Sequence, residues 1–263
     1  MKRNLLALAA IVTAAIACGP SDRTSPALEG AGEAPNEVDS GPCIPSTEVC
    51  TGGEDEDCDG HYDCSDEECY GRDGCPVCGE IDLVEGEPLA LPDGEGGSYE
   101  TSITITGFAD GQTLDFGEHV LGTCVVMEHS WLRDLEIELT CPSGQKIELQ
   151  KFLGKDGEEL FMGDPNDNDG TNPHPGTGAE YCWTDLTDTP PMLMWANQHS
   201  NMHVLPAGDY QPSQSYDDLV GCTLDGDWTI KVTDLWGIDN GFIFSWKIKF
   251  DPTMVDDCDD WVE

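Results

Sequence analysis

Basic side chains are scarce in this sequence of 263 residues. Eleven Lys and Arg stand against 53 Asp and Glu, which gives a formal net charge of −42 at pH 7. A chain with so few cations is repelled by phosphate backbones and by anionic lipid headgroups, so we expect no nucleic-acid partner. Its electric field instead favours solubility and the binding of divalent cations.

Long apolar runs are absent beyond the first residues. A basic tip at residues 2–3 precedes an apolar run over residues 5–17, which is too short to span a bilayer and is typical of a signal peptide at 1–17. Ile-Ala-Cys18 resembles a bacterial lipobox, whose cysteine is lipidated after cleavage; a simple signal peptide followed by a free cysteine is the alternative. We expect an exported protein anchored through Cys18 to the outer membrane or cell surface, with membrane contact only through this anchor.

Common catalytic motifs are also missing. The sequence contains no G-x-S-x-G, no H-E-x-x-H and no phosphate-binding glycine loop. His199 and His203 are four residues apart, but nearby Pro and Met residues favour loop packing over a helical ligand pair. Two carboxylates of a glycosidase could lie among the 53 acids, so the sequence leaves that alternative open. We expect no enzymatic activity.

Before the folded part, residues 18–42 are rich in Pro, Gly, Ser and Glu and contain almost no large apolar side chains. Such a segment cannot bury enough apolar surface to fold, so we expect a disordered tether that follows the lipidated cysteine.

Residues 43–78 form an acidic segment with seven cysteines. Its apolar content is too low for a core, so disulfides or a metal ion must hold its fold. From Asp55 to Asp66 it reads DEDCDGHYDCSD, and alternating carboxylates before a glycine turn are typical of calcium loops. The fit is partial, because Asp66 stands where a twelve-residue loop normally ends in Glu.

This segment better resembles the short D-x-D-C-D-G-x-x-D-C repeats of bacterial surface lipoproteins and the thrombospondin type 3 calcium repeat. We predict a calcium-binding module with the ligands Asp55, Asp57, Asp59, Asp63 and Asp66. An acidic knot held only by disulfides is the alternative. Zinc is disfavoured because oxidation consumes the thiolates that it needs, and Cys75-Pro-Val-Cys78 favours a structural role over a redox pair.

Residues 81–252 show strand patterns punctuated by Gly and Pro, and they predict an all-β, jelly-roll-like antiparallel β-sandwich. Early strands are expected around Ile103–Ile105 and at 119–127, 135–139 and 146–152. Apolar residues then alternate with polar ones at 228–232 and 242–250, joined by a turn-rich link, which predicts a closing hairpin. The region 155–214 is expected to be long and loop-rich, and the tail at 253–263 to be solvated charge.

The late part of the chain contains specific sequence motifs. Gly226-Asp-Trp-Thr-Ile-Lys-Val-Thr-Asp234, then Asp239-Asn-Gly241 and alternating aromatics, resembles the end of the P domain (P/Homo B domain) of kexin-like and furin-like proprotein convertases. The run from His129 through Asp134-Leu135 to Gly144 resembles that family's H-(T/S)-x-x-x-D-L-x-I-x-L-x-S-P-x-G motif, with Thr-Cys in place of a small residue before the proline. Tyr181-Cys-Trp183 and Leu205-Pro-Ala-Gly208 are similar to the bacterial branch, and the resemblance covers residues 99–250.

The resemblance implies a jelly-roll-like module that stabilises and regulates an adjoining serine protease. The subtilisin-like catalytic domain itself needs far more chain than this sequence offers. We therefore expect a non-catalytic module that binds a protein, with a protease or a surface protein as partner. Carbohydrate binding is the alternative, on a platform of exposed indoles; the candidates are Trp131, Trp183, Trp195 and Trp236. Against it, Trp183 and Trp195 are expected to pack in the core and Trp236 to cover the hairpin turn.

Further acids are candidate calcium ligands within the sandwich. Asp134, Asp234 and Asp239 match recurrent P-domain acids, and they either share a cation or cap turns at strand ends. Asp164, Asp167 and Asp169 belong to a second oxygen-rich run, for which Asx-turns without metal are the alternative.

Twelve cysteines remain when Cys18 is set aside, and an even number in an exported protein predicts disulfides. Seven precede residue 80 and five follow it, so one bridge is expected to join the two groups. We predict Cys78–Cys258, because these residues flank the sandwich. Within it we predict Cys124–Cys141 and Cys182–Cys222.

Overall fold

The computed structural model describes residues 43–92, 94, 97–154, 157–166, 173–255 and 258, apart from the side chains of 82–86. The predicted signal peptide, Cys18 and the tether lie outside the described residues, as does most of the acidic tail. In the described part of the chain, no helix is long and apolar enough to cross a membrane.

Eleven strands and one short α-helix make up the fold among the described residues. In chain order they are β1 (Glu80–Ala90), β2 (Gly97–Ile105), β3 (Val120–His129), β4 (Leu135–Thr140), β5 (Lys146–Gln150), β6 (Phe161–Met162), β7 (Ala179–Trp183), α1 (Met192–Gln198), β8 (Val204–Leu205), β9 (Gly208–Tyr210), β10 (Gly226–Asp234) and β11 (Gly241–Phe250). Short 3-10 turns lie between them, at 63–65, 67–69, 117–119, 132–134, 216–219 and 252–254.

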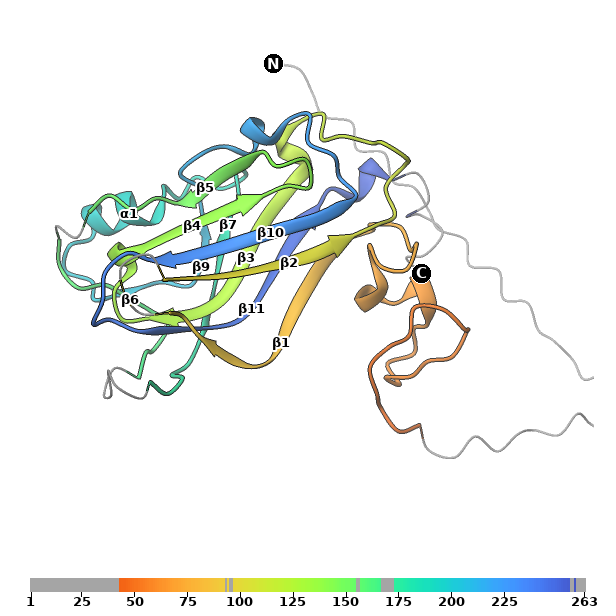
Figure 1. Cartoon of the computed structure of the whole chain (residues 1–263), viewed down its shortest axis with the longest axis horizontal. Coiled ribbons are helices and arrows are strands. Elements are labelled where there is room, and N and C mark those ends of the chain that lie inside the picture. The colour runs from red at the N-terminus through yellow and green to blue at the C-terminus, as the bar shows by residue number, and fades with distance from the viewer. Residues whose placement is uncertain are drawn as a thin grey trace, which may run out of the picture. The chain divides into compact units, whose positions relative to one another are not determined.

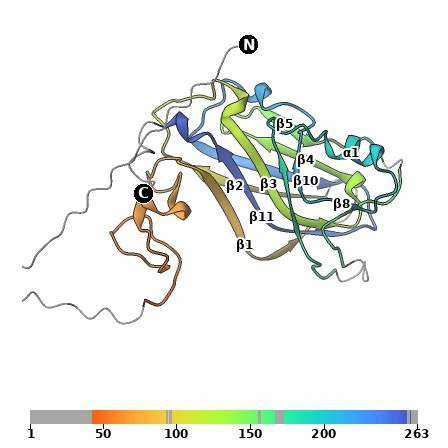
Figure 2. The ribbon, with the colours of Figure 1, turned by 180° about the vertical axis from the view of Figure 1, so that it is seen from behind.

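The strands form two layers (Figure 1). Sheet A has the order β1-β11-β3-β6-β8, with β7 also paired to β3 and β9 to β7, and Figure 2 shows it from behind. Sheet B has the order β2-β10-β4-β5. The predicted all-β sandwich is confirmed. The pairings are antiparallel except for two short parallel ones, β6 with β8 and β7 with β9.

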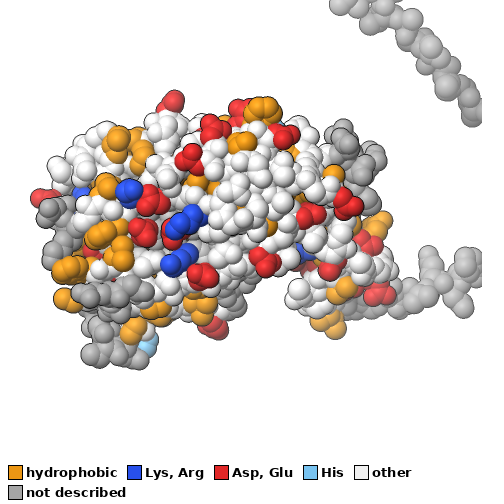
Figure 3. All heavy atoms as spheres, turned by 45° about the horizontal axis from the view of Figure 1, so that its top comes forward, with side chains coloured by type: hydrophobic (Ala, Val, Ile, Leu, Met, Phe, Trp, Pro, Cys, Tyr) orange, Lys and Arg blue, Asp and Glu red, His pale blue; other side chains and the backbone are white. Residues whose placement is uncertain are grey.

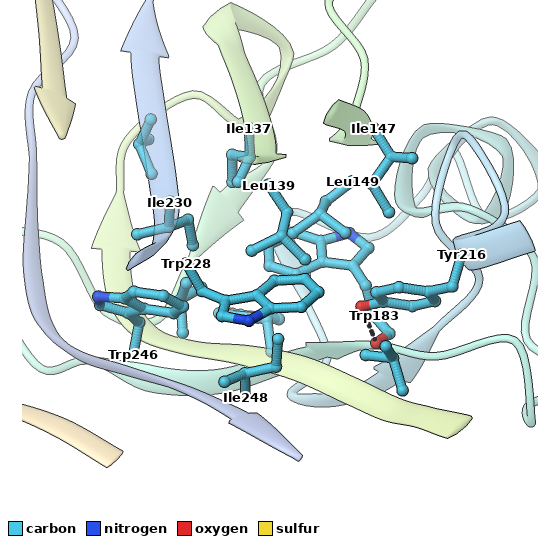
Figure 4. Packing of buried hydrophobic residues seen from close by; sticks show 14 of the residues in the cluster. Ile137, Leu139, Ile147, Leu149, Trp183, Tyr216, Trp228, Ile230, Trp246 and Ile248 are labelled. Carbon is cyan, nitrogen blue, oxygen red and sulfur yellow. Dashed lines mark hydrogen bonds between the residues drawn. The ribbon is translucent and has the colours of Figure 1, made fainter. Parts of the chain in front are cut away.

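The core lies between the two sheets and is rich in aromatic side chains (Figure 4). Trp183, Trp228 and Trp246 are almost fully buried. Trp228 Nε1 donates to the Leu224 carbonyl at 2.8 Å, whereas the buried Nε1 atoms of Trp183 and Trp246 have no hydrogen-bond partner among the described residues. Tyr216 is also buried, and its hydroxyl lies 2.9 Å from the Trp183 carbonyl and 3.0 Å from Thr123 Oγ1. These hydrogen bonds hold the side chains of Trp228 and Tyr216 in place.

The closing hairpin predicted from β10 and β11 is wrong. The two strands belong to opposite sheets, because β10 pairs with β2 and β4 whereas β11 pairs with β1 and β3. Their apolar faces meet across the core, where the rings of Trp228 and Phe250 are 5.4 Å apart in a T-shaped contact. Alternation of apolar and polar residues shows only that each strand has one apolar face. Two strands of a hairpin and two strands in opposite sheets have the same pattern, so the sequence does not distinguish them.

The predicted alternation along β11 holds only in part. Trp246, Ile248 and Phe250 are buried at period two, as expected. Nearer the start of the strand the register with β3 shifts between Ile243 and Ser245, so that Ile243 is buried and Phe244 is only half-buried. A bulge of this kind reverses the inward and outward order of side chains.

Two predicted disulfides inside the sandwich are wrong, whereas Cys78 is bonded to Cys258 as predicted. Instead of Cys124–Cys141 and Cys182–Cys222, the structure has Cys124–Cys182 and Cys141–Cys222. Cys124 lies directly opposite Cys182 in the β3–β7 pairing. Cys141 follows β4 and Cys222 precedes β10, the neighbour of β4 in sheet B. Closeness along the chain is a poor guide here, since the sheets pair strands that are distant in sequence.

The acidic module at 43–78 joins the sandwich through backbone contacts at 71–78. Thr106 N donates to the Gly71 carbonyl at 2.7 Å, and Val77 belongs to the sandwich core. Gly107 has a φ of +101°, and a Cβ built there would lie 2.0 Å from the Cys75 carbonyl oxygen. Only glycine fits where the two backbones meet so closely.

Gly107→Ala should therefore destabilise the protein more than Gly111→Ala, which serves as control. Gly111 also has a left-handed φ, of +72°, but open space around it. Its substitution should lower the free energy of unfolding by about 1–2 kcal/mol from backbone strain alone. Gly107→Ala should cost about 1–3 kcal/mol more because the Cys75 backbone must move. Urea unfolding of both variants measures the difference, and equal midpoints would contradict the close contact.

Candidate metal-binding sites

Three disulfides hold the acidic module in place of a hydrophobic core. They are Cys43–Cys58, Cys50–Cys69 and Cys64–Cys75. Within this frame the carboxylates organise the backbone, because Asp57, Asp59 and Asp66 each accept a hydrogen bond from the amide two residues ahead, at 3.0, 2.8 and 2.6 Å. These Asx-turns use one oxygen of each carboxylate and leave the other available.

Two groups of acids in the module converge. The possible ligand atoms of Asp57, Asp59 and Asp66 lie within 4.8 Å of one another, and so do those of Glu48, Asp55 and Asp57. Asp57 belongs to both groups. We name the five residues together the module acid cluster. Four of the five predicted calcium ligands, Asp55, Asp57, Asp59 and Asp66, fall in these groups, and their binding of calcium stays a prediction. Asp63 belongs to neither group and accepts a hydrogen bond from Gly53 N at 3.1 Å.

Burial distinguishes two members of the module acid cluster. Asp66 is 1% exposed, and its Oδ2 is buried without a hydrogen-bond partner. Glu48 is 8% exposed, and loss of solvent raises its pKa, although hydrogen bonds from the amides of Glu56 and Asp63 oppose the shift. Glu48 was missed because it lies outside the D-x-D pattern; its position inside the Cys43–Cys58 loop was the available signal.

The chemistry of this donor set fits a hard divalent cation. All five side chains offer carboxylate oxygens, which Ca²⁺ takes in sets of six to eight at about 2.3–2.6 Å. A buried, partnerless carboxylate oxygen is costly, and a cation would satisfy it. The acidic groups present can thus hold a metal ion.

A second group of acids lies at the end of the sandwich where β4 begins and β10 ends. Asp134 and Asp234 are each 1% exposed, and Asp239 is half-buried in the link to β11. The backbone brings them together, because Leu235 N donates to the Asp134 carbonyl at 2.9 Å and β10 pairs with β4 up to Asp234. Their ligand atoms do not form one of the groups within 4.8 Å found among the described residues. The metal site predicted for these three acids stays a prediction.

Repulsion dominates the electrostatics of this second group. Burial, followed by the charges of Asp239 and Asp234, raises the pKa of Asp134 to about 7. His129 is fully buried nearby, with Nε2 3.7 Å from Asp234 Oδ2. Its Nδ1 accepts a hydrogen bond from Trp131 N at 3.0 Å, so the neutral ring carries its proton on Nε2, towards Asp234. Burial and repulsion between these carboxylates thus favour a proton on Asp134.

Of the remaining predicted ligands, only Asp164 lies among the described residues. The side chain of Asp164 is exposed, and its backbone pairs with Thr177 through two hydrogen bonds of 2.9 Å. Asp167 and Asp169 lie outside the described residues, so their calcium site stays a prediction. Acidic side chains are otherwise spread over the surface, and most of the few lysines lie beside them (Figure 3), as in the pairs of Glu138 with Lys146 and of Glu148 with Lys151.

The four candidate indoles for carbohydrate binding differ in exposure. Trp183 is buried in the core, as predicted, and Trp131 and Trp195 are partly buried. Trp195 stacks on His199 at the end of α1, with ring centroids 4.1 Å apart. Trp236 is 39% exposed on the link between the sheets. His199 lies just beyond the helix, and its Nδ1 is 2.8 Å from the Trp195 carbonyl. The loop predicted before it is wrong, because Met192–Gln198 form α1.

The fold and these sites define an all-β sandwich with an attached, disulfide-held acidic module. No protein-family model matches the chain, and no curated protein matches it significantly. Among solved structures, it is similar to the serine protease of Aeromonas sobria, in complex with its chaperone (TM-score 0.31, 14% identity) and alone (0.30, 15%). Each match covers 65% of this chain and 26% of the protease chain. We draw no conclusion about activity from similarity at this level.

The raised pKa of Asp134 predicts a loss of stability with rising pH. The folded protein holds this proton more tightly than the unfolded chain, in which the carboxyl has its usual pKa of about 3.9. The stabilisation is complete below that value and is lost as the pH rises towards about 7. Over this range the free energy of unfolding should fall by at most about 4 kcal/mol, at 1.36 kcal/mol per pKa unit.

Asp134→Asn mimics the protonated carboxyl, so in chelator it should raise the melting temperature at pH 7.5 and leave it nearly unchanged at pH 4.5. Asp209→Asn, at an exposed acid of β9, is the control and should keep the wild-type pH dependence. Thermal unfolding followed by circular dichroism measures both. A variant Asp134→Asn that melts below wild type at pH 7.5 would show that the carboxylate is needed in its charged form.

Proposed function

We propose that this chain is a non-catalytic, lipid-anchored surface protein whose β-sandwich acts as a P-domain-like module for binding another protein. Calcium bound at the module acid cluster stabilises it. Export and lipidation rest on the N-terminal sequence up to Cys18, and the P-domain assignment rests on the motifs around Asp134 and Asp234. A protease or a surface protein is the expected partner, and the chain assists that partner rather than catalysing a reaction.

One observation carries the calcium proposal: Asp66, whose buried Oδ2 has no hydrogen-bond partner, offers a carboxylate oxygen within 4.8 Å of oxygens of Asp57 and Asp59. Without a cation, these charges repel one another in a module that has no core to resist the repulsion. With a cation, each free oxygen gains a ligand bond and the Asx-turns hold the carboxylates in place. The large negative charge of the chain also attracts divalent cations to it.

Carbohydrate binding is the weaker candidate. A sugar platform needs exposed aromatic faces, and among the four indoles considered only Trp236 is more than a third exposed. Trp183 is unavailable because it lies in the core.

Calcium should raise the melting temperature of residues 19–263. A ligand that binds only the folded state stabilises it by about 2.7 kcal/mol at one hundred times its Kd. For a protein of this size that corresponds to a rise of roughly 5–10 °C. Magnesium should have little effect, because it demands a tighter octahedral geometry. Differential scanning calorimetry in calcium, magnesium and chelator makes the comparison.

Asp66→Asn should abolish most of this rise, since it removes the buried charge while keeping the oxygen that accepts from Glu68 N. Asp63→Asn is the matched control: it removes one charge from the same module, lies outside both acid groups and should keep the calcium response. An unchanged melting temperature of the wild type at millimolar calcium would rule out calcium as the stabilising ion.

A further inference from the structure

A groove of about 1060 Å³ separates the acidic module from the edge of the sandwich. One wall is Ser102–Thr104 of β2, together with the start of β1, and the other is Pro45–Thr47 of the module. The carboxylates of Asp57, Glu67 and Glu68 also line it. In Figure 1 the end of β2 and the start of β1 lie at the same end of the sandwich. The groove is distinct from the module acid cluster, although Asp57 belongs to the cluster and also lines the groove.

The β2 wall offers a strand edge. Within the part of the chain that the structure describes, β2 pairs only with β10, so its other side belongs to no ladder. At the end of that side, Thr106 N donates to the Gly71 carbonyl. Backbone groups alternate along an extended chain, so the N–H and C=O of Thr104 and Ser102 point in the same direction as those of Thr106, into the groove.

The pairing on the other side of β10 supports this assignment. Leu235 N donates to Asp134 on the β4 side, so the odd-numbered residues of β10 direct their backbone groups to β4 and the even-numbered ones to β2. Trp228 is even-numbered and stands opposite Ile103, so the backbone of Ile103 is hydrogen-bonded to β10. Ser102 and Thr104 are then left to hydrogen-bond outwards.

The acidic lining of the groove favours a positively charged ligand. Asp57, Glu67 and Glu68 face a single basic residue, Arg72, in the lining. Glu80 is also part of the lining, but it is paired with Lys247 and Lys249 of β11. An acidic groove beside a strand edge attracts an extended segment that carries Lys or Arg.

We propose that this groove binds an extended, lysine- or arginine-rich segment of the partner protein as an additional strand on β2. The backbone of the segment pairs with Ser102 and Thr104, and its cationic side chains reach Glu67 and Glu68. The inference rests on the proposed protein-binding function and names the kind of segment that is recognised.

The test uses a fluorescein-labelled nonapeptide of alternating Lys with Thr or Val, titrated with residues 19–263 in calcium and followed by fluorescence anisotropy. Saturable binding is expected. A second peptide of the same sequence carries N-methyl groups on alternate residues, on the edge that would pair with β2. It keeps the charge but cannot form the ladder, so its affinity should fall about tenfold or more. This comparison requires no change to the protein.

Charge variants test the location. Glu67→Gln with Glu68→Gln should weaken binding about tenfold. Glu158→Gln with Glu159→Gln removes the same charge from two adjacent, exposed glutamates outside the groove lining and should change affinity less than about twofold. Ser102→Pro removes one outward N–H and should weaken binding as N-methylation does, since proline is tolerated at strand edges.

Three results would overturn the proposal: no saturation up to about 1 mM protein, equal losses from the two glutamine pairs, or equal affinity of the N-methylated peptide. Equal losses would mean diffuse attraction to an acidic surface. The calcium proposal and the groove proposal can be tested separately. A calcium-dependent melting temperature without peptide binding refutes only the proposal that the groove binds a peptide. Peptide binding without a calcium response refutes only the metal proposal.

Discussion

The sandwich depends on the packing of β10 against β11 across the core. Each strand is central in its own sheet, so their contact joins all the other strands into one structure. Phe250 is the meeting point, since its ring lies 5.4 Å from the rings of both Trp228 and Phe108. Aromatic side chains bury 150–250 Å² each, so a few such contacts supply much of the hydrophobic stabilisation. The short segment between Asp234 and Gly241 must cross from one sheet to the other, and that crossing brings Asp234 and Asp239 close to Asp134.

The acidic module, unlike the sandwich, is not stabilised by a hydrophobic core. It has almost no apolar interior, and three disulfides with a network of Asx-turns take the place of a core. The carboxylates shape the backbone: Asp57, Asp59 and Asp66 each accept one amide hydrogen bond in an Asx-turn, whereas both oxygens of Glu48 and of Asp55 accept from backbone amides. Attachment to the sandwich then relies on a close backbone contact at Gly107 and on the disulfide between Cys78 and Cys258. The arrangement also creates the groove beside β2, which neither part would possess alone.

The module acid cluster and the acids at the end of the sandwich differ in how repulsion between their carboxylates is relieved. In the module, Asp57 and Asp59 are partly or largely solvated, so repulsion is moderate and a cation can reach them. At the end of the sandwich, Asp134 and Asp234 are buried together, so protonation of Asp134 relieves the repulsion even without a metal. The raised pKa of Asp134 couples stability to pH, and under our proposal the module acid cluster couples it to divalent cations.

Alternation at period two and the spacing of carboxylates are local properties of the chain, so the β class, most of the longer strands and the acidic loop can be predicted from the sequence. The convergence of Asp57, Asp59 and Asp66 can be predicted too, since a glycine turn brings nearby residues together. Which strands pair depends on contacts between distant segments, and therefore so do the packing of β10 against β11 and the bond of Cys124 to Cys182. The same holds for Glu48 and for the groove at Ser102–Thr104, because both arise where segments distant along the chain meet, and no local pattern records which segments these are.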